Sequence, residues 1–180
     1  MTRASPINAS IRAIHALSRA SGALAAFCLG AACVVVCQMV VARYILGTST
    51  IWQNEFVTFA IVAATLLGSP YVLLTRGHVN VDLLPHYLRP GARRWLALFA
   101  SALGWIACAT LTWTGWQYFH EAWAAGWVTP SLWAPPLWIP LLPLPVGLGL
   151  LTLQYTADIF CIATNRAAPF GPAADLVDGP

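Results

Sequence analysis

Four long stretches without a single charged residue dominate this sequence. They cover residues 21–42, 56–75, 95–119 and 137–157, and each is 20 to 25 residues long. A helix rises about 1.5 Å per residue, so roughly 20 residues cross the hydrocarbon core of a bilayer. All fifteen formal charges fall outside these stretches, as expected if a charge at the bilayer centre costs about 2.5–3.5 kcal/mol. The sequence therefore predicts an all-α integral membrane protein with four transmembrane helices.

The overall composition excludes several other classes of protein. Only 8% of the residues are charged, against roughly 25% in an average soluble domain. The net charge of +3 is small and scattered, so no nucleic-acid partner is expected. The cysteines form no CxxC pair, and we interpret them as small apolar packing residues rather than disulfide or metal sites. They are Cys28, Cys33, Cys37, Cys108 and Cys161.

The distribution of arginines predicts how the helices are oriented. Positively charged residues near helix ends stay on the cytoplasmic side of a membrane. Eight of the nine arginines lie before the first stretch, between the second and third, or after the fourth, and only Arg43 lies on the other side. Both termini are therefore expected in the cytoplasm. In the second loop we expect three arginines to contact lipid headgroups as well; these are Arg89, Arg93 and Arg94.

The chain is expected to divide into three parts. Residues 1–20 carry isoleucine and leucine at helical spacing, which is typical of either a short interfacial helix on the cytoplasmic surface or a disordered segment. Residues 21–160 form the four-helix transmembrane domain. Residues 161–180 are rich in Ala, Pro, Gly and Asp, and we expect them to be a disordered cytoplasmic tail.

No ionisable residue lies within the four stretches, although transporters usually bind their solute or coupling ion with such groups near the midplane. The chain is therefore interpreted as a helper subunit, without a cofactor. Two features suggest packing surfaces. Gly22, Ala26 and Gly30 would permit close helix approach. A stripe of Trp105, Thr112, Trp116 and Trp123 would face either lipid or a partner.

Several short motifs, taken in order along the chain, resemble one family. The first is Arg43-Tyr44-Ile45-Leu46-Gly47, followed by Trp52, Glu55 and Leu67-Gly68; the second loop carries Arg76, His78, Val81 and Asp82; the third loop and last helix carry Thr129-Pro130, Trp138-Ile139-Pro140 and Leu144-Pro145-Val146-Gly147. Together they resemble the small membrane subunit, or small permease, of tripartite ATP-independent periplasmic (TRAP) transporters.

This resemblance implies a non-enzymatic, multi-pass subunit of the bacterial inner membrane. It would act as a scaffold for a large multi-span permease subunit, which imports an organic anion such as a carboxylate with a sodium gradient. A periplasmic solute-binding protein would deliver that anion. The alternative is a membrane anchor for a quinone-linked redox enzyme.

The candidate residues have structural or interface roles; no catalytic, metal-binding or cofactor-binding residue is expected. Arg43 and Glu55 would form either an outer-surface pair or a contact with the large subunit or the binding protein. His78 and Asp82 are four residues apart and would fold the second loop. The full set of candidate structural or subunit-interface residues is Arg43, Trp52, Glu55, His78, Asp82, Pro130, Pro145 and Gly147.

Overall fold

The computed structural model describes residues 6–75 and 90–164, and every regular element in this part of the chain is a helix. All four long helices are long and apolar enough to cross a membrane. The prediction of an all-α protein with four membrane-spanning helices is therefore confirmed. The elements are α1 (Pro6–Tyr44), α2 (Trp52–Leu74), α4 (Pro90–Ala124), α5 (Trp138–Leu141) and α6 (Pro143–Ala163).

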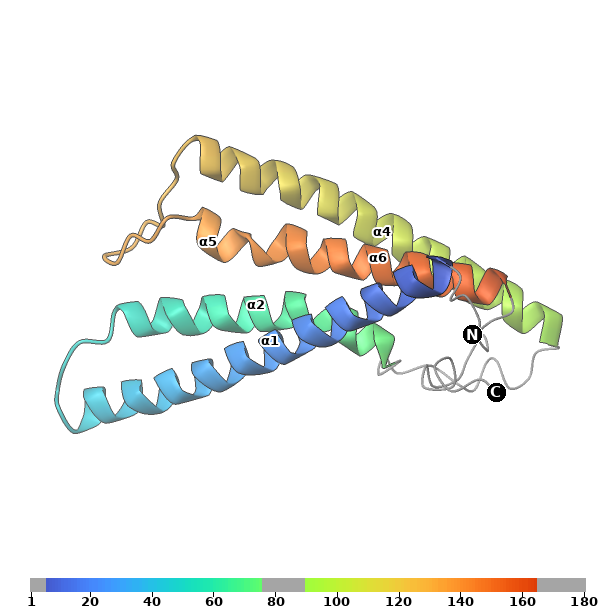
Figure 1. Cartoon of the computed structure of the whole chain (residues 1–180). Helices are drawn as coiled ribbons and strands as arrows, with labels where there is room; N and C mark the ends of the chain where they lie inside the picture. Colours follow the sequence, from blue (N-terminus) through green and yellow to red (C-terminus); the bar gives the residue numbers. More distant parts are fainter. Residues whose placement is uncertain (1–5, 76–89, 165–180) are drawn as a thin grey trace.

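The long helices form an open row rather than a closed bundle (Figure 1). One antiparallel hairpin is α1 with α2, the other is α4 with α6, and α2 packs against α6 in the middle. At the end with the connecting segments 45–51 and 125–137 the hairpins diverge, whereas toward the other end α1 crosses over to contact α6. The order is thus α1, α2, α6, α4, and much of each outer helix lacks a protein neighbour.

The seam between α1 and α2 has a regular repeat. Buried and half-buried positions of both helices are spaced alternately three and four residues apart. This spacing is typical of left-handed helix pairing, and small side chains allow the backbones to approach closely. The positions on α1 are Ser18, Ser21, Ala25, Cys28, Ala32, Val35, Met39 and Ala42; those on α2 are Gln53, Val57, Ala60, Ala64, Leu67 and Leu74, with the exposed Tyr71 at the same spacing between the last two.

Of the three small residues noted on α1, one lies at a close helix contact within this chain. A Cβ on Gly22 would lie 2.6 Å from Cγ of Tyr71, so Gly22 does lie at a close contact. Ala26 is exposed, however, and nothing lies within 4 Å of a Cβ built on Gly30. The reason is that the seam follows the alternating repeat, whereas a strict spacing of four drifts away from the contact line.

The aromatic stripe on α4 lies along the joint with α6. Trp105 donates a hydrogen bond from Nε1 to Oγ1 of Thr156 (2.9 Å), and the Trp123 and Trp138 ring centroids are 4.8 Å apart. Trp116 and Trp123 are still about half exposed. The stripe therefore contacts other parts of the chain and also exposes aromatic rings on the outside of the molecule.

The helix ends differ from the sequence-based limits. Residues 6–20 are helical but continue into the first span without a break, so α1 is a single helix of 39 residues rather than two. The fourth stretch is divided at Leu142 into α5 and α6. His78, Asp82, Arg89 and the residues from 165 onward lie outside the described residues; Arg93 and Arg94 lie in α4, but their side chains are likewise outside the description.

The C-terminus of α4 has a glycine cap that fixes the start of the third loop. Gly126 adopts φ +61°, in the left-handed region. The N–H of Trp127 then reaches the carbonyl of Ala122 (3.1 Å), and the N–H of Gly126 reaches that of Trp123 (3.3 Å). This is the Schellman arrangement, which satisfies carbonyls left free at a helix end.

Candidate functional site

A buried polar cluster joins the two hairpins where α1 crosses α6. Gln154 is fully buried and Ser18 is only 1% exposed. Oγ of Ser18 donates to Oε1 of Gln154 (3.0 Å), and Nε2 of Gln154 donates to Oδ1 of Asp158 (3.4 Å). Oγ of Ser21 donates to the carbonyl of Ser18 (2.9 Å). Polar groups in an apolar interior are costly unless they are hydrogen-bonded, so this cluster fixes the crossing of the hairpins.

The second joint between the hairpins depends on Gly147 of α6. A Cβ at this position would lie 2.5 Å from the carbonyl oxygen of Leu66 in α2 and 2.7 Å from its carbonyl carbon. About one turn before Gly147, α6 begins at Pro143, and Pro145 lies buried in its first turn. Proline is tolerated there because first-turn N–H groups have no helical partner. Gly147 therefore sets the approach of α6 to α2, whereas Pro145 lines the side of α6 that faces α4.

At the helix ends next to the first loop, Arg43 and Glu55 do not form a pair, which was one of the two arrangements considered for them. Nη2 of Arg43 donates instead to Oγ1 of Thr50 (2.9 Å), a buried residue in the first loop. Within the described part of the chain, Arg43 makes no ion pair with Glu55. Its hydrogen bond ties the end of α1 to the segment leading into α2.

Glu55 has a half-buried side chain in the first turn of α2. Its Oε2 atom is buried, and no hydrogen-bond donor among the described residues reaches it. Oε1 of Gln53 is likewise buried and accepts no hydrogen bond from a described residue. Nε2 of the same side chain donates to Oε1 of Gln38 (3.5 Å). Buried acceptors of this kind are rare in native structures and call for a physical explanation.

The third loop contacts α2 through aromatic rings. The ring centroids of Trp52 and Trp133 are 6.3 Å apart. The loop folds back on itself, since the N–H of Thr129 donates to the carbonyl of Pro135 (3.0 Å) and the N–H of Leu137 to that of Trp127 (2.8 Å). Pro130 lies exposed beside Thr129, which is buried. Trp52 thus links the outer ends of the two hairpins.

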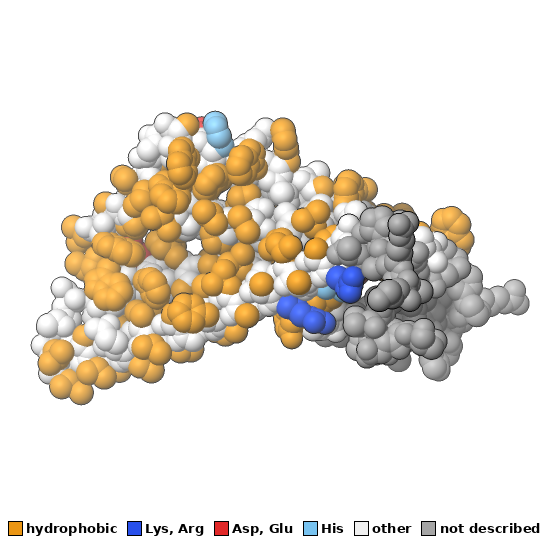
Figure 2. Space-filling model, in the orientation of Figure 1, with side chains coloured by type: hydrophobic (Ala, Val, Ile, Leu, Met, Phe, Trp, Pro, Cys, Tyr) orange, Lys and Arg blue, Asp and Glu red, His pale blue; other side chains and the backbone are white. Residues whose placement is uncertain are grey.

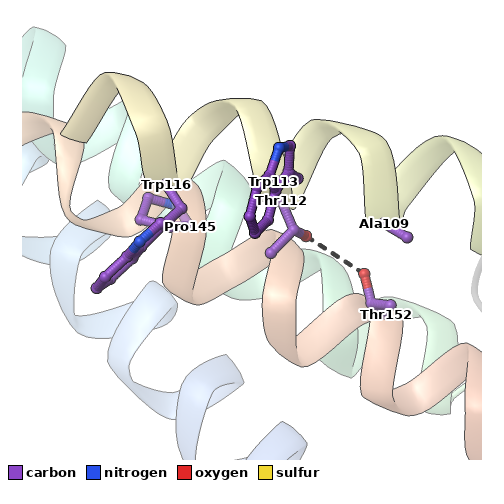
Figure 3. A pocket seen from close by; sticks show the side chains of 6 residues that line it. All are labelled: Ala109, Thr112, Trp113, Trp116, Pro145 and Thr152. Atoms are coloured by element: carbon purple, nitrogen blue, oxygen red, sulfur yellow. Dashed lines mark hydrogen bonds between the residues drawn. The ribbon is translucent and has the colours of Figure 1, made fainter. Parts of the chain in front are cut away.

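An open apolar groove of about 370 Å³ runs between α4 and α6 (Figure 3). Its threonine hydroxyls are already bonded: Thr112 donates to the carbonyl of Cys108 (2.7 Å), Thr152 to that of Leu148 (2.8 Å), and the two hydroxyl oxygens are 3.3 Å apart. The two threonine hydroxyls of the groove therefore donate their protons within the chain, and the groove carries no charged side chain. It is lined by Ala109, Thr112, Trp113, Trp116, Pro145 and Thr152.

The outside of the molecule matches a membrane-embedded protein. Figure 2 shows hydrophobic side chains over most of the visible face, with the basic side chains gathered at the end next to the residues not described. Five large side chains on α1 and α4 are between 65% and 76% exposed: Phe27, Val34, Trp95, Phe99 and Trp113. Among residues 6–75 and 90–164, no group of three His, Cys, Asp or Glu could hold a metal ion.

Comparison with known proteins agrees with the resemblance noted in the sequence. Residues 32–165 match the family model described as tripartite ATP-independent periplasmic transporters, DctQ component. The C4-dicarboxylate TRAP transporter small permease protein DctQ of Vibrio cholerae serotype O1 is 26% identical over 164 residues, covering 79% of this chain and 71% of that protein. The protein of the same name from Rhodobacter capsulatus is 24% identical over 123 residues, covering 68% of this chain and 54% of that protein.

A family model that covers most of the membrane helices, together with two relatives that carry the same description, establishes what kind of protein this is. The chain is a multi-pass inner-membrane transporter component rather than an enzyme, and it belongs to the DctQ family, the small permease subunits of TRAP transporters.

Proposed function

We propose that this chain is a scaffold that braces the large permease of a sodium-driven TRAP transporter and does not itself carry the solute. The observation that carries the proposal is the chemistry of the membrane-spanning part. Its four apolar stretches contain no ionisable residue, and the hydroxyls of its groove are already hydrogen-bonded. Asp158 lies just past the fourth stretch in α6 and accepts a hydrogen bond from Gln154. Because no Asp, Glu, His, Lys or Arg lies within the stretches themselves, we infer that a second subunit supplies the groups that couple solute to sodium.

The open row of helices supports the same proposal. A chain whose outer helices expose large aromatic and aliphatic side chains offers broad surfaces to another membrane protein. The partners would be a large multi-span permease and a periplasmic solute-binding protein, with membrane lipids around them. Two relatives are named for C4-dicarboxylates, so an organic carboxylate is the proposed cargo of the complex.

The remaining candidate residues have supporting roles in this proposal. Eight arginines on one side support a cytoplasmic location for both termini and the second loop. Arg89, Arg93 and Arg94 would contact anionic headgroups there. His78 and Asp82 would fold the second loop. Gly147 would keep α6 close to α2, so that the two hairpins present one surface.

Reconstitution into liposomes tests the proposal directly. With a sodium gradient, this chain alone should take up no organic acid from a panel that includes C4-dicarboxylates. The cognate large permease and binding protein should transport only when this chain is present as well. Sodium-driven uptake by the isolated chain, or full uptake without it, would contradict a scaffold role.

A further inference from the structure

Glu55 lies on the side of α2 that faces the second hairpin. Trp52, Glu55 and Leu66 fall within about 60° of one another on a helix that turns 100° per residue. Leu66 is the residue against which Gly147 of α6 packs, and Trp52 contacts Trp133 of the third loop. The first turn of α2, which carries the buried and unbonded Oε2 atom of Glu55, therefore lies at the end where the two hairpins diverge (Figure 1).

Among the residues that the structure describes, no cation is placed to neutralise this carboxylate. The sequence contains no lysine, and the one arginine expected on the outer side is Arg43. Arg43 belongs to α1, across α2 from the second hairpin, and it donates to Thr50. The imidazole of His120 and the carboxylate of Glu121 are exposed on α4, which is separated from α2 by α6 in the row (Figure 1).

An unpaired carboxylate in a partly buried site is costly, and charge complementarity calls for a cationic donor. We propose that a lysine or arginine side chain of the large permease inserts between the outer ends of the two hairpins and pairs with Glu55. This inference rests on the proposed function, since it assumes that the large permease covers the open row. The donor must come from a membrane-embedded neighbour, because the acceptor lies among helices and aromatic rings rather than on an exposed loop.

Measurement of complex affinity in lipid nanodiscs tests this pairing. The full chain and its cognate large permease would be compared as wild type, Glu55→Gln and Glu55→Lys, with Glu121→Gln as the matched control. We expect Glu55→Gln to raise the dissociation constant about 30-fold or more, because truncating one member of a buried charge pair is expensive. Glu55→Lys should weaken binding further, and Glu121→Gln should leave it within about twofold of wild type.

A reciprocal exchange identifies the donor. In the Glu55→Lys background, each outer-side lysine and arginine of the large permease would be replaced by glutamate in turn, and one replacement should restore most of the lost affinity. Affinity of Glu55→Gln within twofold of wild type would overturn the pairing, since water or a bound ion would then suffice. Failure of every reciprocal exchange would overturn it too. If the wild-type chains themselves do not bind, the scaffold proposal fails as well.

Discussion

Replacement of Gly147 by alanine adds one atom, a Cβ, where α6 packs against α2. The new Cβ would lie 2.5 Å from the carbonyl oxygen of Leu66, whereas ordinary contact begins at 3.4 Å. The obstructing atoms belong to backbone, so no side-chain rotation relieves the clash. The axes of α2 and α6 must therefore separate by about 0.9 Å at this level, and gaps of this size forfeit a quarter to a half of the dispersion energy of nearby contacts.

Gly149 provides a matched control on the same helix. A Cβ there would lie 3.7 Å from Cγ2 of Thr112, an ordinary contact. Both substitutions gain about 0.5–1 kcal/mol because alanine is a better helix former than glycine. Only Gly147→Ala also incurs the cost of overpacking, which is typically about 1–3 kcal/mol. The free energy of unfolding of Gly147→Ala should therefore lie about 1–3 kcal/mol below that of Gly149→Ala.

The measurement is the unfolding of the purified chain in mixed micelles, with SDS as the denaturant and tryptophan fluorescence as the signal. Wild type, Gly147→Ala and Gly149→Ala would be titrated side by side. The order of stability should be Gly149→Ala, then wild type, then Gly147→Ala. Equal stability of the two variants would refute the reasoning, because the close approach of α6 to Leu66 would then have no energetic consequence.

Two further predictions concern the polar cluster and the orientation. Ser18→Ala should lower the free energy of unfolding by about 1–2 kcal/mol, because it leaves Oε1 of the fully buried Gln154 without its donor. The control Thr65→Ala removes only a hydrogen bond within α2 and should change the free energy of unfolding by less than about 0.5 kcal/mol. Equal effects of the two substitutions would contradict a special role for the cluster. In a cysteine-free background, Leu132→Cys in the third loop should react with an impermeant thiol reagent on intact cells and Thr164→Cys at the end of α6 should not, whereas the reverse pattern would refute the arginine-based orientation.

The sequence by itself determined the number and type of the membrane-spanning elements. Charged residues are excluded from the bilayer core at a cost of several kcal/mol each, so four charge-free stretches could only be four spanning helices. Motif order also predicted the family correctly. Helix ends were less predictable: α4 runs to Ala124 because its last turns are capped by Gly126, a local signal that hydropathy does not contain.

The tertiary structure alone decided which faces of the helices meet. In a soluble protein the apolar face is the buried one, but in a membrane the lipid-facing and protein-facing sides are both apolar, so periodicity does not separate them. Sequence reasoning therefore placed Gly30 in a packing face that the structure leaves open, and it passed over Ser18 as a partner of Gln154. It also left open a pair between Arg43 and Glu55. Only the path of the first loop, which brings Thr50 to Arg43, leaves that carboxylate without a partner.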